Sequence, residues 1–135
     1  MKLGKKLTAL GMTTGMILAA LAATAAPASA ATYGGQCGSG YNVIRSASVG
    51  GQGTAFLTYR AANTTNCVVV IRNSPGAAIP MNAWLKRSNE STWQQDPGNW
   101  TTYAGPVYRS AASQCVDWGG SIGNYQVTYR QDACG

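Results

Sequence analysis

The sequence predicts an all-β domain, built as a small antiparallel sandwich or barrel of seven or eight short strands and held by two disulfides. Three observations favour this fold class. Alternating or β-branched runs recur through residues 31–135, separated by Gly, Asn, Ser and Pro. No segment there keeps a 3.6-residue apolar period without a Gly or Pro, so we expect no helix. An even number of cysteines, four, lies in this short stretch.

The first 30 residues predict a removable secretory signal peptide. Three lysines precede a mostly apolar run over residues 7–26, and Ala28-Ser29-Ala30 forms an A-x-A cleavage site. A retained anchor helix is the alternative, but the Gly and Thr residues in the run and the cleavage site argue against it. The chain therefore divides into a signal peptide, residues 1–30, and a single all-β domain, residues 31–135. No later apolar run reaches 18 residues, so we expect a secreted protein with no membrane anchor after processing.

The first three strands form a predicted meander. Residues 41–47 alternate in part, and residues 54–60 place Ala55, Leu57 and Tyr59 on one face. Residues 67–72 hold a continuous β-branched run, which is typical of a strand covered on both faces. Polar and Gly-containing turns separate the three segments.

A Pro/Gly loop leads to a fourth predicted strand over residues 81–87. The polar segment 88–99, which contains Pro97-Gly98, is expected to be one mobile loop. Residues 100–103 and 106–110 are expected to flank a bend at Ala104-Gly105-Pro106.

The last two strands form a predicted hairpin. Residues 114–118 and 125–130 are expected to pair across a Gly-rich connection, residues 119–124. This strand order also ranks the disulfide pairings.

Four cysteines allow three connectivities. In the predicted meander, Cys37 and Cys67 fall at the same end, and in the final hairpin Cys115 and Cys134 do likewise. We therefore expect the pairs Cys37–Cys67 and Cys115–Cys134, each adding about 3–4 kcal/mol of stability in the chain-entropy model. A metal site is not expected, because the chain has no C-x-x-C pair and no histidine.

The charge of the domain argues against nucleic acid as a partner. Three of the ten basic residues lie in the predicted signal, so seven face four acidic residues and the net charge is +3. Only Lys86 and Arg87 are adjacent, whereas nucleic-acid-binding modules cluster their basic residues.

Catalysis is not expected, and neither is a cofactor. Without histidine the chain has no serine triad of the usual kind and no Cys-His pair, and paired cysteines provide no thiolate. A glycosidase needs two carboxylates about 5 to 9.5 Å apart. The candidates are Glu90, Asp96, Asp117 and Asp132. Glu90 and Asp96 share the polar segment, where carboxylates are usually solvated, and Asp117 lies within a strand and could bond a neighbouring turn.

Aromatic side chains are the more suggestive feature, because rings on a β surface can stack on sugars or contact another protein. The domain contains four Trp, seven Tyr and one Phe. We expect Tyr59, Trp84 and Trp118, which lie in predicted strands, to be core residues. The candidate contact surface consists of Trp93, Trp100 and Tyr103, in or beside the polar segment.

Four blocks of sequence carry a resemblance to a known family. They are CGSGY at 37–41, NCVVVIRN at 66–73, YAGPVY at 103–108 and CVDWGGSI at 115–122. Together these blocks resemble the actinobacterial spore-associated protein A family, small exported proteins found on spores and aerial filaments. The resemblance covers nearly all of residues 31–135. It implies a location and supplies no catalytic or binding residue.

The leading hypothesis is a secreted, non-enzymatic, disulfide-stabilised protein associated with the cell or spore surface. One alternative is a glycan- or cell-wall-binding module that acts through Trp93, Trp100 and Tyr103. Another is a secreted inhibitor or toxin-like protein that docks residues 88–99 into a target. The expected partner is accordingly a cell-wall or spore-surface polymer, or a protein.

Overall fold

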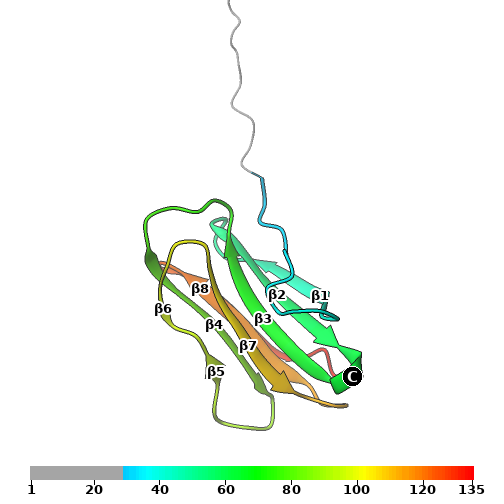
Figure 1. Cartoon of the computed structure of the whole chain (residues 1–135). Coiled ribbons are helices and arrows are strands. Elements are labelled where there is room, and N and C mark those ends of the chain that lie inside the picture. The colour runs from blue at the N-terminus through cyan, green and yellow to red at the C-terminus, as the bar shows by residue number, and fades with distance from the viewer. Residues whose placement is uncertain (1–28) are drawn as a thin grey trace, which may run out of the picture.

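The computed structural model describes residues 29–135 and shows two antiparallel sheets packed face to face (Figure 1). The predicted all-β class is confirmed, as a sandwich and not as a closed barrel. Nearly all of the predicted signal peptide, residues 1–28, lies outside the described residues. Within the described part, the helical structure is a single 3₁₀ turn, η2 (Ala61–Asn63), between two strands.

The first sheet has the strand order β1-β2-β3-β7. Its strands are β1 (Asn42–Ser48), β2 (Gly53–Arg60), β3 (Thr65–Arg72) and β7 (Tyr103–Ser110). The β1-β2-β3 meander confirms the predicted order of the first three strands. β3 lies between β2 and β7 and is therefore central.

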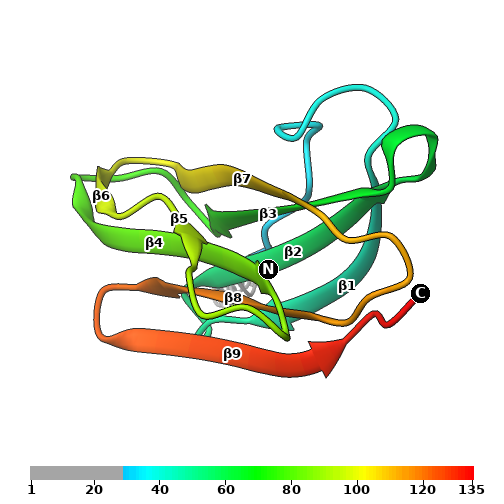
Figure 2. The same cartoon turned by 90° about the horizontal axis from the view of Figure 1, so that it is seen from below.

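The second sheet has the order β5-β4-β8-β9, and β6 also pairs with β4. Its strands are β4 (Ile79–Arg87), β5 (Gln94–Gln95), β6 (Gly98–Trp100), β8 (Val116–Ile122) and β9 (Tyr125–Asp132). The chain changes sheets three times, between β3 and β4, between β6 and β7, and between β7 and β8. Figure 2 shows β9 along the outer edge of this sheet, and the C-terminal residues Cys134 and Gly135 line a hollow together with Ile44 and Arg45 at the start of β1.

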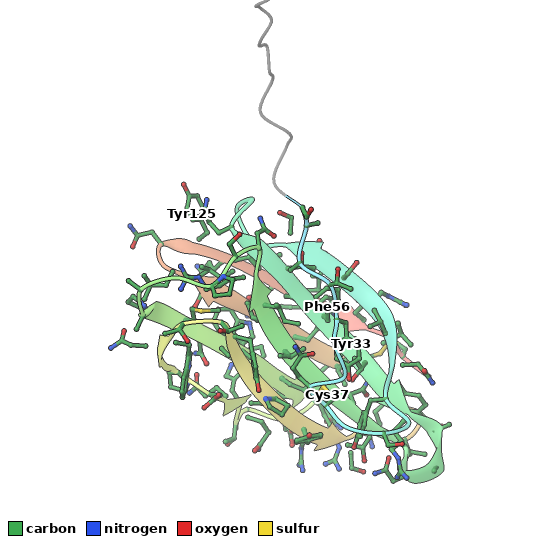
Figure 3. The ribbon with its side chains drawn as sticks, turned by 45° about the horizontal axis from the view of Figure 1, so that its top comes forward. Tyr33, Cys37, Phe56 and Tyr125 are labelled. Atoms are coloured by element: carbon green, nitrogen blue, oxygen red, sulfur yellow. A yellow bond between two sulfur atoms is a disulfide. The ribbon has the colours of Figure 1, made fainter. Side chains whose placement is uncertain are left out.

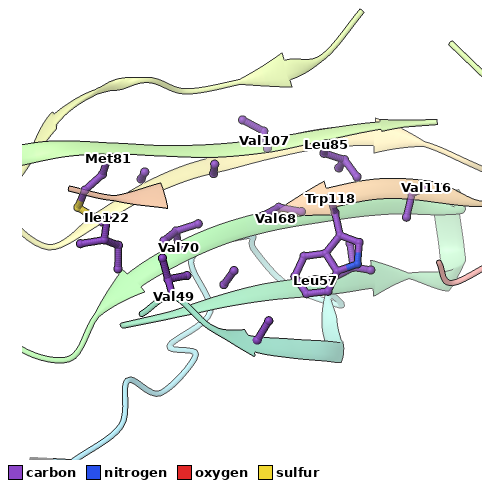
Figure 4. Close-up of a cluster of buried hydrophobic side chains, with 14 of the residues drawn as sticks. Val49, Leu57, Val68, Val70, Met81, Leu85, Val107, Val116, Trp118 and Ile122 are labelled. Atoms are coloured by element: carbon purple, nitrogen blue, oxygen red, sulfur yellow. The ribbon is translucent and has the colours of Figure 1, made fainter. Parts of the chain in front are cut away.

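The main core fills the space between the sheets (Figure 4). Val68 and Val70 from β3 meet Leu85 from β4 and Trp118 from β8, and all four are almost fully buried. The expected core position of Trp118 is therefore confirmed, whereas Tyr59 is only half-buried and lies outside the core cluster.

A second, smaller cluster covers the outer face of the first sheet. The segment before β1 brings Tyr33 over Phe56, with ring centroids 6.0 Å apart (Figure 3). The same cluster contains Val69, which points away from the main core. The expectation that the β-branched run is covered on both faces is thus confirmed. The Cys37–Cys67 disulfide holds the covering segment to β3.

The prediction that residues 88–99 form a single loop is wrong, because two short strands, β5 and β6, lie in this part of the chain. The domain therefore has nine strands instead of the seven or eight predicted. Gln94 and Gln95 of β5 pair with Leu85 and Trp84 of β4, and β6 pairs with the start of β4. The segment is polar because it forms an edge of the sheet, where one side faces water.

The predicted turn at residues 119–124 is also wrong, because Gly119 and Gly120 belong to β8. A Cβ on Gly120 would lie 2.2 Å from Val70 Cγ2 of the facing sheet, and one on Gly119 would lie 1.9 Å from the Val127 carbonyl oxygen. These glycines are required by close packing and not by a turn. The connection shrinks to Gly123 and Asn124.

Likewise, the expected bend at Ala104-Gly105-Pro106 lies inside one strand. β7 runs through it, and the ladder with β3 shifts register between Val68 and Val70. Gly105 adopts a φ of 92°, which accommodates the irregularity without ending the strand.

Candidate functional site

The outer face of the second sheet carries the most distinctive arrangement of side chains. Trp84 on β4 and Thr128 on β9 are both register partners of Gly119 on the intervening β8. The Trp84 indole Nε1 donates a hydrogen bond to Thr128 Oγ1 at 3.1 Å. The indole therefore reaches across β8 at the register position of Gly119, which carries no side chain.

Trp93 lies beside this indole, against two cations. Lys86 Nζ is 5.1 Å and Arg130 Cζ is 5.7 Å from the Trp93 ring centroid, which is cation–π distance. Both cations also pair with the same atom, Asp117 Oδ2, at 3.0 Å each. Trp93 thus contacts a charged cluster that is already internally paired.

Asp117 is the centre of that cluster and is almost fully buried. Its Oδ1 accepts hydrogen bonds from Ser88 Oγ at 2.6 Å and from the Gln131 backbone N–H at 2.9 Å. Burial alone would raise the pKa of Asp117, but the bonds from Ser88 and Gln131 and the contact with Lys86 outweigh it and lower the pKa to about 2. The carboxylate is therefore ionised at all physiological pH values. The expectation that Asp117 bonds a neighbouring turn holds for Ser88.

A shallow surface hollow of about 260 Å³ opens between the two indoles. It is lined by Asn82, Trp84, Trp93, Gln95 and Thr128. Asn82 Nδ2 donates to Gln95 Oε1 at 3.1 Å, which orders the two amides at one side. The lining thus combines two indole rings with two amides and a hydroxyl.

The three predicted contact residues line two different hollows. Trp100 and Tyr103 meet at a separate hollow of about 300 Å³, whereas Trp93 meets Trp84. Trp100 is half-buried against the main core, and its Nε1 donates to the Asp96 carbonyl oxygen at 3.3 Å. Tyr103 is 38% exposed. The three residues are thus divided between two hollows, and their role in contacting a partner stays a prediction.

Trp84, like Tyr59, is not the core residue that its place in a predicted strand suggests. It is half-buried on the outer face of its sheet, not in the core. The alternation of side chains along β4 indicates the position of Trp84. Met81, Ala83 and Leu85 all point into the core, so Trp84 must point outward.

Glu90 is not a solvated carboxylate, contrary to the expectation. Its two oxygens accept hydrogen bonds from Arg109 Nε and Nη2 at 2.8 and 2.7 Å, and Oε1 also accepts the Arg87 backbone N–H at 2.9 Å. The Arg109 hydrogen bond is the largest cause of a lowered pKa, about 2. Glu90 thereby ties the segment after β4 to β7.

The two remaining acidic candidates also have structural partners. Asp96 Oδ2 accepts the Gly105 backbone N–H at 2.9 Å, so it is not simply solvated either. Asp132 accepts from Trp118 Nε1 at 3.0 Å and from Arg45 Nε at 3.2 Å. Burial would raise the pKa of Asp132, and the Trp118 and Arg45 contacts together lower it.

The four cysteines are joined as Cys37–Cys67 and Cys115–Cys134, the same pairs that the strand order predicts. The first pair holds the N-terminal segment to β3, and the second closes the end of the β8–β9 hairpin. Among residues 29–135, no group of three or more His, Cys, Asp or Glu side chains is placed to hold a metal ion. No helix in the described part of the chain has the length and apolarity of a membrane span.

Comparison with known proteins identifies a relative of this chain. The chain is 46% identical over 134 residues to "Spore-associated protein A" of Streptomyces coelicolor, an alignment that covers 98% of this chain and 87% of that protein. No family model and no solved structure matches the chain significantly. The aligned stretch spans both sheets of the sandwich. The chain therefore belongs to the spore-associated protein A family.

Proposed function

We propose that this chain is an exported, non-catalytic protein, stabilised by two disulfides, that stays on the surface of the cell or spore. The observation that carries the proposal is the 46% identity, over 98% of the chain, to a relative whose name associates it with spores. The predicted signal peptide supplies a route of export. Two disulfides fit an oxidising environment outside the cytoplasm.

The state of the acidic residues supports a non-catalytic role. A general acid in a glycosidase needs a carboxyl group with a raised pKa. Here the pKa values of Glu90 and Asp117 are lowered to about 2, because cations and hydrogen-bond donors surround both. The chain also has no histidine, and its four cysteines are all paired.

The inhibitor alternative receives less support from the structure. An inhibitory loop needs to protrude so that it can enter a target site. Residues 88–99 instead follow β4, with two short ladders and a hydrogen bond from the Asp96 backbone N–H to the Ala83 carbonyl oxygen at 3.1 Å.

Fractionation of the organism that makes the protein tests the proposal. Cytosol, washed cell envelopes, culture fluid and, where formed, spores are separated and probed with an antibody against residues 31–135. We expect the protein in the washed envelope or spore-surface extract, and protein found only in the culture fluid would contradict retention at the surface. Protein confined to the cytosol would overturn the proposal.

A further inference from the structure

We propose that the hollow between Trp84 and Trp93, on the outer face of the second sheet, binds a sugar ring of a glycan chain. The proposal adds a site and a ligand class to the surface location argued above, and it does not depend on that location. It also replaces the predicted grouping of Trp93 with Trp100 and Tyr103.

The chemistry of the lining selects this ligand. The two indoles offer flat apolar surface, while Asn82, Gln95 and Thr128 offer amide and hydroxyl groups at its margin. A pyranose has the matching character, because its C–H face is apolar and its rim carries hydroxyl groups. Although Asn82 bonds Gln95 and Thr128 accepts from Trp84, the Gln95 amide N–H₂ and the Thr128 hydroxyl hydrogen are still available to ligand oxygens, which a purely apolar partner would not use.

The electrostatics favour an uncharged ring over an anion. Of the described residues, none with a charged side chain lines the hollow. The neighbouring cations, Lys86 and Arg130, are both paired with Asp117 Oδ2 at 3.0 Å, and Trp93 lies against them. An anionic ligand would have to compete with a buried carboxylate for its counter-charge.

The site is ordered before any ligand arrives. The hydrogen bond to Thr128 fixes the plane of the Trp84 indole, and the contacts with Lys86 and Arg130 hold Trp93. The Asn82–Gln95 hydrogen bond orders the amides. Side chains that are already immobilised lose little entropy on binding, so a small and open hollow can still contribute useful affinity.

The volume of the hollow indicates that it holds one sugar ring of a longer glycan chain. About 260 Å³ lies below the usual range of pockets for free small molecules, which begins near 300 Å³. A polymer ring can lie in such a hollow while its neighbours extend over the sheet. The rival hollow at Tyr103 is less suited, because the Trp100 indole there is packed against the core.

Co-sedimentation of the oxidised protein with insoluble polymers tests the proposal. Chitin, cellulose and purified peptidoglycan are the three probes, which separate an amino-sugar source from a glucose source. The variants are Trp84→Ala, Trp93→Ala and Gln95→Ala. Gln95 is exposed, so its replacement leaves the fold intact whatever happens to the tryptophan variants. Tyr103→Ala is the matched aromatic control, and thermal unfolding verifies that every variant is folded.

We expect the wild-type protein and Tyr103→Ala to bind at least one polymer equally well. Trp84→Ala and Trp93→Ala should bind about tenfold more weakly or worse, as for a stacking hot spot, and Gln95→Ala should be weakened measurably. Absence of wild-type binding to all three polymers would overturn the proposal. So would binding that is unchanged in folded Trp84→Ala and in Gln95→Ala, or that is lost only in Tyr103→Ala. These outcomes are independent of the fractionation result.

Discussion

The Trp84 indole reaches Thr128 across an entire strand, with its Nε1 donating to the threonine hydroxyl at 3.1 Å. The two residues lie on β4 and β9, and β8 passes between them. The β8 residue in register with both is Gly119, and a Cβ there would lie 1.9 Å from the Val127 carbonyl oxygen of β9. The Trp84 side chain therefore links the two strands that flank β8 on the outer face of the second sheet.

Gly119→Ala should destabilise the protein by about 1–3 kcal/mol, because overpacking forces a backbone shift. The added Cβ would lie 1.9 Å from the Val127 carbonyl oxygen. Urea unfolding followed by fluorescence measures the loss. Gly34→Ala is the control, since its Cβ would meet only the side chain of Gln36, at 3.4 Å. Equal stability of the two variants would show that β8 and β9 are not so close at Gly119.

Asp117→Asn should cost about 3–5 kcal/mol, because it removes the negative charge that compensates buried Lys86. The comparison is Arg45→Ala, which breaks the exposed Arg45–Asp132 pair and should cost less than about 1 kcal/mol. Both free energies of unfolding are obtained from urea titrations at neutral pH. If Asp117→Asn lowers the free energy of unfolding no more than Arg45→Ala does, the carboxylate does not compensate a buried charge.

Stability should fall in acid, and the pKa values set the window. The pKa of Asp117 drops from 3.8 to about 2 on folding, and that of Glu90 from 4.5 to about 2. A lowered folded-state pKa contributes stability that is complete above the unfolded pKa and is lost as pH falls through the folded one. We expect a plateau above about pH 5 and a steady loss between about pH 4.5 and pH 2.

The variants Glu90→Gln and Asp117→Asn test whether these two carboxylates cause the loss of stability in acid. Each should be less stable at neutral pH and should show a shallower decline toward pH 2. Thermal unfolding from pH 2 to pH 8 provides the profile. A decline as steep as that of the wild type in both variants would assign the acid sensitivity to other groups.

Replacing Cys37 and Cys67 together by alanine should lower the free energy of unfolding by about 3–4 kcal/mol. The disulfide closes a loop with a sequence separation of 30 and holds the segment that covers Phe56. We therefore expect the segment around Tyr33 to become susceptible to limited proteolysis, while the main core stays folded. Unchanged proteolysis would show that packing alone retains the segment.

Much of the fold could be predicted because the signals were local. The meander follows from the alternation of residues 54–60 and the β-branched run of residues 67–72, and the disulfide pairs follow from that order. Local sequence signals mispredict the structure where a glycine is required by close contact with a residue far away in the sequence. Gly119 and Gly120 indicate a turn by composition, yet Val127 and Val70 require them inside a strand.

The candidate site was harder to predict because it depends on which residues lie side by side across strands. Trp93 was identified as a contact residue from its polar surroundings alone. Its partner Trp84 lies on β4, beside β5, and single-sequence reasoning could not show that residues 94 and 95 pair there. For the same reason Glu90 looked solvated, because Arg109 approaches it from a separate strand.

Mass spectrometry of the native protein, isolated without reduction from culture fluid and surface extracts, tests the central claim most directly. We predict an intact mass for a chain that lacks residues 1–30 and is four hydrogens lighter than its reduced form. Peptide mapping should then join Cys37 to Cys67 and Cys115 to Cys134. A full-length chain with four free thiols, or a peptide that links Cys37 to Cys134, would contradict the account.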